Sequence, residues 1–198
     1  MFPLGTVLVP TGVLPLHVFE PRYRALVERC LAGEPEFGVV LIERGSEVGG
    51  GDVRFEVGTV ARIVEAARYD DGRFALVTVG AQRVRVERWL DDDPYPRAVV
   101  TPVPDAPAGP GDVRRRDAVE ASLRRVLALA SELGAAMPAG LDLPADPVAA
   151  GWRAAALAPL GPLDALALLQ VDEPAARLDR LVAMLDDLAE LLTLRLES

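Results

Sequence analysis

The spacing of hydrophobic and polar positions changes once along the chain, near residue 105. Before it, short apolar or alternating runs separated by turn residues predict β-strands. These strands are expected at residues 7–9, 14–19, 37–42, 57–64, 74–79, 83–88 and 95–103. The run Asp70-Asp71-Gly72 predicts a hairpin turn, because glycine accepts the positive φ that a tight turn requires. Pro94, Pro96 and Pro102 indicate that the last strand lies at a sheet edge.

One helix interrupts the predicted strands, at about residues 21–31. Tyr23, Leu26, Val27 and Cys30 fall on one face at helical spacing, so this face should pack on the sheet. A proline in the first turn and a glycine after the last turn are typical of the two ends of a helix.

Beyond a linker rich in Pro, Gly and Ala at residues 102–111, the pattern is helical. Helices are expected at residues 112–133, 146–158 and 162–170, and from residue 172 to the C-terminal end. Asp146 and Pro147 match the N-cap and first position of a helix. Leu191 and Leu194 lie off the apolar stripe of the last helix, which suggests burial on two sides. The pattern thus predicts an α+β protein, with a β-rich domain of six or seven strands at residues 1–105 and a four-helix domain at residues 106–198.

Composition narrows the chemistry that the chain can perform. All 21 basic residues are arginine, and His17 and Cys30 are the only histidine and cysteine. The absence of lysine excludes a phosphate-binding loop of the usual kind, a Schiff base and a Ser–Lys dyad. A zinc site built on two histidines is also excluded, and no metal or cofactor is expected. The formal net charge of -9 argues against nucleic-acid binding. With one cysteine, no apolar run long enough for a bilayer and no secretory pattern, we expect a cytoplasmic protein with no membrane contact.

Five blocks of sequence, in the right order, resemble the substrate-binding N-terminal domain of Lon proteases. The first runs from Phe2-Pro3-Leu4 to Glu20-Pro21-Arg22-Tyr23. The others are residues 37–40, 57–63, 72–86 and 164–190. The resemblance implies a PUA-like β pseudo-barrel with one inserted helix, followed by a C-terminal four-helix segment. It also implies a non-catalytic module that binds client or partner polypeptides, since the residues of the ATPase and protease modules are absent from this sequence.

A polypeptide-binding surface should be apolar and concave. Its candidate residues are Phe19, Glu20, Arg22, Tyr23 and Trp152. For the residues from Phe19 to Tyr23 in this list, a structural role is the favoured interpretation. Glu20 would lie at the start of the predicted helix, where a carboxylate suits the free N–H groups, and Phe19 and Tyr23 would anchor this helix on the barrel.

Other functions of this fold remain open on the sequence. A small-ligand or RNA-binding sensor would need a pocket or a basic patch. Arginines 114–116, 124 and 125 are expected on the solvent face of a helix, and Arg62, Arg83 and Arg85 on polar strand faces. A hydrolase would need His17 and Cys30 to meet, although Cys30 is expected in a helix core and His17 on an outward strand position. Asp91-Asp92-Asp93 favours a solvated turn over a cation site, because prolines follow where a calcium loop has further ligands.

Overall fold

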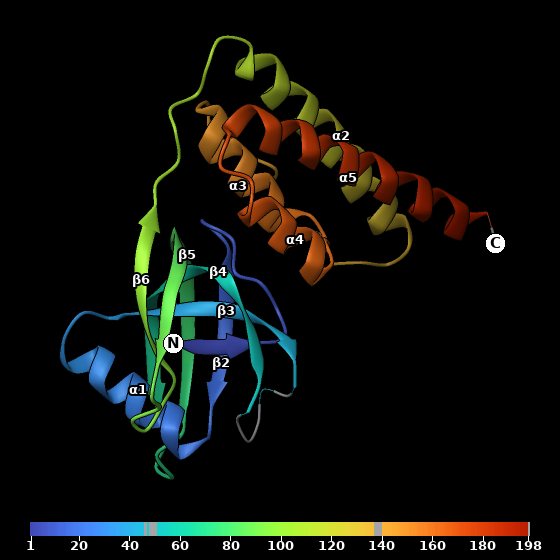
Figure 1. Ribbon diagram of the computed structural model, residues 1–198. Coiled ribbons are helices and arrows are strands. Elements are labelled where there is room, and N and C mark those ends of the chain that lie inside the picture. The colour runs from blue at the N-terminus through green and yellow to red at the C-terminus, as the bar shows by residue number, and fades with distance from the viewer. Residues whose placement is uncertain (46, 48–50, 137–139, 198) are drawn as a thin grey trace. The chain divides into compact units, whose positions relative to one another are not determined.

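The computed structural model describes residues 1–45, 47, 51–136 and 140–197 (Figure 1). The chain divides into two compact units, Met1–Pro104 and Asp105–Ser198. Of the described residues, the first unit contains six strands and one helix and is called the β unit below. The second contains four helices in its described part and is called the helical unit. The expected mixed α+β fold is therefore confirmed.

The β unit is a six-stranded sheet with one helix. Its elements are β1 (Phe2–Leu4), β2 (Val13–Val18), α1 (Pro21–Ala32), β3 (Glu36–Arg44), β4 (Val53–Arg68), β5 (Phe74–Leu90) and β6 (Arg97–Val103). The strand order is β1-β3-β4-β5-β2, and β6 also pairs with β5. Among the strand pairs of the described residues, β1–β3 is parallel and the others are antiparallel. Gly72, with φ of 82°, lies in the turn between β4 and β5, which confirms the predicted hairpin.

The prediction of a strand at residues 7–9 is wrong, because this segment belongs to a loop between β1 and β2. The end of this loop is hydrogen-bonded to β5. The amide of Thr11 donates to the carbonyl of Gly80 at 2.8 Å, and the amide of Gly80 donates to the carbonyl of Gly12 at 2.9 Å. Leu8 and Val9 are buried. The apolar run that suggested a strand is thus a buried loop.

The two strands predicted at 74–79 and 83–88 are one continuous strand, β5. Its register against β4 shifts between the pairs Ala61–Gly80 and Thr59–Arg83, so β5 carries an extra residue there. Such a bulge interrupts the alternation of side chains. Arg83 and its neighbour Val84 are both buried, and only 1% of the Arg83 surface is exposed. The prediction that Arg83 lies on a polar strand face was therefore wrong.

Helix α1 packs on the sheet with the face that its sequence predicts. Tyr23, Leu26, Val27 and Cys30 are its buried residues. The ring of Tyr23 stacks on Phe2 of β1 with the centroids 4.1 Å apart. Further members of this core, from the strands, are Val18, Phe37, Val39, Ala61, Ile63, Phe74 and Leu76. The core fixes α1, β1 and the ends of β2 and β5 relative to one another.

The helical unit contains α2 (Asp112–Glu132), α3 (Pro147–Leu157), α4 (Pro162–Leu169) and α5 (Pro174–Leu196). Asp146 caps α3 as predicted, accepting a hydrogen bond from the amide of Ala149 at 2.8 Å. Helix α5 begins two residues later than expected. None of the helices in the described ranges is both long and apolar enough to cross a membrane.

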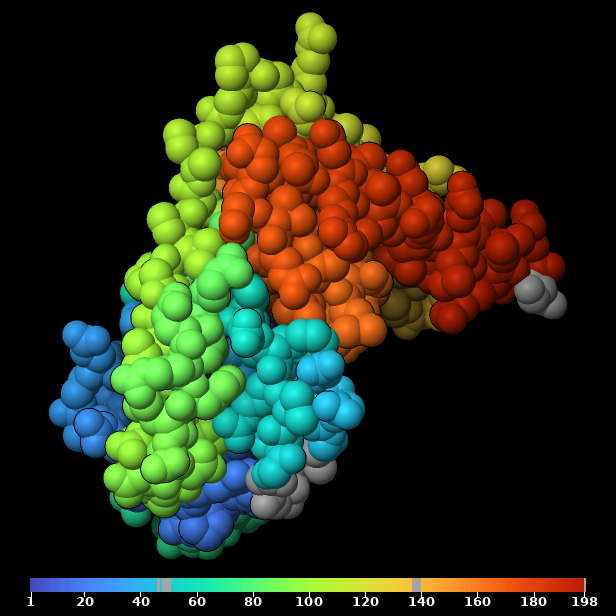
Figure 2. Space-filling model, in the orientation of Figure 1, coloured from blue at the N-terminus to red at the C-terminus, as the bar shows by residue number. Residues whose placement is uncertain are grey.

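The expected burial of α5 on two sides is wrong. Leu178, Leu181, Leu185 and Leu192 are buried, but Leu191 and Leu194 are 47% and 64% exposed. Figure 2 shows α5 as a continuous red surface on the visible side of the helical unit. Its off-stripe leucines face solvent in the part of the chain that the structure describes.

Trp152 belongs to a buried polar cluster of the helical unit. Its indole Nε1 donates to the Asp105 carboxylate at 2.7 Å. The Arg177 guanidinium lies over the indole ring, 4.1 Å from its centroid, and pairs with the same carboxylate at 2.9 Å. Arg177 also donates to the carbonyl of Val171 at 3.0 Å. A carboxylate, a cation and an aromatic ring thus satisfy one another inside the unit.

Candidate functional site

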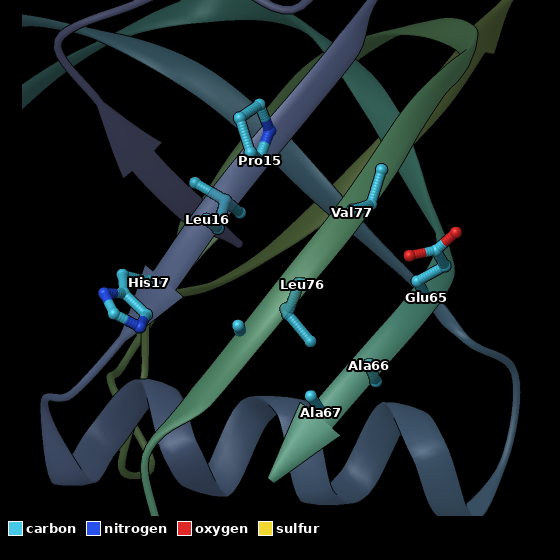
Figure 3. A pocket seen from close by; sticks show the side chains of 9 residues that line it. Pro15, Leu16, His17, Glu65, Ala66, Ala67, Leu76 and Val77 are labelled. Atoms are coloured by element: carbon cyan, nitrogen blue, oxygen red, sulfur yellow. The ribbon is translucent and has the colours of Figure 1, made fainter. Parts of the chain in front are cut away.

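An open groove of about 500 Å³ lies on the β unit, over three neighbouring strands (Figure 3). Its lining residues come from β2, β5 and the end of β4: Pro15, Leu16, His17, Glu65, Ala66, Ala67, Ala75, Leu76 and Val77. The volume is within the range of ligand sites, and seven of the nine lining residues are apolar. Figure 3 shows His17 at one side of the groove and Glu65 at the other, with the apolar side chains between them.

Strand pairing explains how these residues meet. Pro15 pairs with Val77, and His17 pairs with Ala75. Ala75 pairs in turn with Ala67 of β4. Side chains alternate between the faces of a strand, and the intervening Leu76 is part of the core. The side chains of these paired residues therefore lie on the face of the sheet that points away from this core.

The groove was not predicted, although a signal for it exists in the sequence. A strand with one face in solvent should carry polar residues on that face. Along Phe74-Ala75-Leu76-Val77-Thr78-Val79, the outward positions are instead Ala75, Val77 and Val79. Val13 continues the row beside Val79 and is exposed. A contiguous apolar row on an outward strand face is unusual and is typical of surfaces that contact another molecule.

A smaller cavity of about 170 Å³ lies between β1 and β2, the first and last strands in the strand order given above. It is lined by β1 and β2, which do not pair with each other, and by Phe19, Glu20, Tyr23 and Glu47. Pro15, Leu16 and His17 of β2 also line the larger groove. Three of the candidate residues are thus brought together beside the groove.

The structure places the candidate residues in different environments. Phe19 is 53% exposed, so its expected role as an anchor of α1 was wrong. The reason is that Val18, at the end of β2, is buried and the next residue points the other way. Tyr23 is buried, and burial raises its pKa to about 12. Glu20 is the N-cap residue of α1 as expected, but its side chain makes no capping hydrogen bond and pairs with Arg22 at 3.1 Å instead. Trp152 is buried in the helical unit.

Cys30 and His17 occupy the positions expected from the sequence. The Cys30 thiol is buried and donates to the carbonyl of Glu36 at 3.2 Å. Burial raises the pKa of this thiol, which keeps it protonated and unreactive. His17 is exposed on β2 and meets the ring of Tyr69 edge-on, with the centroids 5.7 Å apart. Nothing in this geometry activates the thiol as a nucleophile.

Cys30 should therefore be alkylated by iodoacetamide much more slowly in the folded protein than in denaturant, because the thiolate is the reactive form. Mass spectrometry of samples quenched at intervals measures the two rates. A folded-state rate equal to that of the denatured chain would contradict the burial described here.

Several of the arginines considered as a basic patch pair with acids, and Arg83 is buried, whereas Arg114 and Arg125 are exposed on α2 as expected. Arg115 pairs with Asp179 at 2.9 Å, and Arg116 and Arg124 pair with Glu120 at 2.7 and 2.6 Å. Asp91 to Asp93 lie in an exposed turn between β5 and β6, as expected. Among the described residues, no group of three or more His, Cys, Asp or Glu side chains is placed to hold a metal ion.

Comparison with known proteins points to one family. The family model of the ATP-dependent protease La (LON) substrate-binding domain matches residues 1–187. A Lon protease 2 from Herpetosiphon aurantiacus is 30% identical over 96% of this chain, and a Lon protease from Dictyoglomus thermophilum is 29% identical over 67%. These matches cover only 24% and 16% of the two relatives.

Solved structures agree with this match. A Lon N-terminal domain protein from Xanthomonas campestris is 32% identical, with a TM-score of 0.66 over 92% of this chain and 95% of that chain. The N-terminal domain of the Mycobacterium avium complex Lon protease has a TM-score of 0.64 at 20% identity, over 93% and 97% of the two chains. The second likeness shows the fold alone. The expected PUA-like fold is confirmed, because the structural neighbours are Lon N-terminal domains.

Proposed function

Because the chain belongs to the family of Lon protease substrate-binding domains, we propose that it is a non-catalytic module that binds apolar segments of client or partner polypeptides. The groove over β2, β5 and β4 is the proposed binding surface. The observation that carries this proposal is the row of apolar side chains on the outward face of three paired strands.

The apolar area and the open shape of the groove both favour the binding of a chain segment. Burying one valine or leucine side chain contributes about 1.5–3 kcal/mol, and the groove offers several apolar contacts at once. It is open rather than enclosed, so a chain segment can lie across it without its ends being buried. Unfolded polypeptides expose such apolar segments, whereas folded proteins bury them.

This chain matches only 24% of the length of the Herpetosiphon aurantiacus relative, and the family model that matches residues 1–187 is that of a substrate-binding domain. The sequence contains no lysine, so it cannot form the Ser–Lys dyad excluded above. The family match and the absence of a Ser–Lys dyad both support a role in binding without catalysis.

Ala67→Glu should weaken the binding of an unfolded polypeptide about tenfold or more, because a charge in the groove loses water when an apolar segment covers it. Ala67 is exposed, so the fold should tolerate the change. Fluorescence anisotropy with a labelled, permanently unfolded protein measures the affinity.

Val99→Glu on β6 is the matched control, since Val99 is exposed outside the groove. Equal affinity for the Ala67→Glu variant and the unmodified protein would rule out the groove. A parallel titration with single-stranded RNA tests the alternative function, for which salt-dependent binding is the expected sign.

A further inference from the structure

Among the described residues that line the groove, Glu65 is the only one with a carboxylate. It is exposed, and within the described ranges no ion pair is formed by its carboxylate. The arginines on either side of it on β4 are already engaged: Arg62 pairs with Glu36 at 2.8 Å and Arg68 pairs with Glu28 at 3.1 Å. The groove therefore presents a negative charge that this unit does not neutralise by a direct pair.

A bulge in β4 directs Glu65 into the groove. The register shifts between the pairs Ile63–Thr78 and Glu65–Val77, which leaves Val64 as the extra residue. With regular pairing, Val64 would lie opposite Val77 and would extend the apolar row. Bulges re-aim side chains in this way and are common next to functional sites. The carboxylate is thus positioned by a specific irregularity of the backbone.

The register also gives a distance. Pro15 pairs with Val77, and Val77 pairs with Glu65, so Glu65 lies two strands away from Pro15. Neighbouring strands are about 4.8 Å apart, which gives a separation of about 10 Å. An extended chain rises about 3.3 Å per residue. A residue seated between β2 and β5 is about one and a half strand spacings, or about 7 Å, from β4, which an extended segment covers with about two residues. Residues two apart in an extended segment point to the same face, so both can face the groove.

We propose, on the basis of the proposed function, that the groove selects apolar segments that carry a lysine or arginine two residues from an apolar residue seated beside Pro15. The apolar residue packs between β2 and β5, and the basic residue pairs with Glu65. The overall charge of -9 favours the approach of such segments and disfavours acidic ones.

Three short labelled peptides test this selectivity by fluorescence anisotropy. They share an apolar core and carry arginine, glutamine or glutamate at the second position after the anchor residue. An exposed ion pair changes affinity by about two- to fivefold. The unmodified protein should bind the arginine peptide more tightly than the glutamine peptide by this factor, and the glutamate peptide most weakly.

Glu65→Gln should abolish the difference between the arginine and glutamine peptides, and Glu65→Arg should reverse the order of the arginine and glutamate peptides. Glu87→Gln, at an exposed β5 position outside the groove, should leave the preference unchanged. If all three peptides bind the unmodified protein equally, the selectivity is refuted while polypeptide binding stands. A preference that persists in Glu65→Gln also refutes it. If no peptide and no unfolded protein binds, the proposed function fails together with the selectivity.

Discussion

Replacing Trp152 with alanine should lower the free energy of unfolding of the helical unit by about 3–5 kcal/mol, the usual cost of removing a buried large aromatic side chain. Trp152 is 3% exposed, and its ring supports the Arg177 guanidinium at 4.1 Å. Its Nε1 also donates to Asp105 at 2.7 Å. The variant therefore leaves a cavity, an uncovered buried cation and a carboxylate that has lost a donor.

Urea unfolding followed by far-ultraviolet circular dichroism measures the change, because most of the helix lies in this unit. Trp152→Phe is the matched control. It keeps an aromatic ring under Arg177 and loses the hydrogen bond to Asp105, which should cost about 1–2 kcal/mol. If Trp152→Ala instead kept full stability and lost polypeptide binding, the tryptophan would be a contact residue and not part of the unit's interior.

The fold was predictable where the signals are local. The hairpin at Gly72, the capped start of α3 and the apolar face of α1 are each encoded within a few neighbouring residues, and the structure contains all three. The loop at residues 7–9 was mistaken for a strand because apolar spacing records burial and not hydrogen bonding. What buries this loop is β5, some seventy residues further along the chain.

The candidate site depends on pairing between distant strands and was therefore less accessible from the sequence. The groove needs β2 beside β5 and β5 beside β4, and none of these registers can be read from a single run. Two bulges then move individual side chains. One buries Arg83 against the expected alternation, and the other places Glu65 opposite Val77. A single extra residue reverses which face a side chain takes, so the orientation of Arg83 was predicted wrongly and that of Glu65 could not be read from alternation alone.

Gly80→Ala should destabilise the β unit by about 3 kcal/mol, at the upper end of the range for overpacking. A Cβ atom at this position would lie 2.2 Å from the carbonyl oxygen of Val9 and 2.9 Å from its carbonyl carbon. Both atoms are backbone, so no side chain can move aside to relieve the clash. The same close approach holds the two hydrogen bonds that join Gly80 to Thr11 and Gly12, and the variant should weaken both.

The effect of Gly80→Ala should also extend to the groove, because β2 begins at Val13, directly after these hydrogen bonds, and carries Pro15 and His17. Urea unfolding followed by Trp89 fluorescence in a Trp152→Phe background reports the β unit, since Trp89 lies in β5. Gly33→Ala is the matched control: its Cβ would lie 3.7 Å from the nearest atom, an ordinary contact. Equal stability of the Gly80→Ala and Gly33→Ala variants would show that the loop can yield, and polypeptide binding should then be unchanged as well.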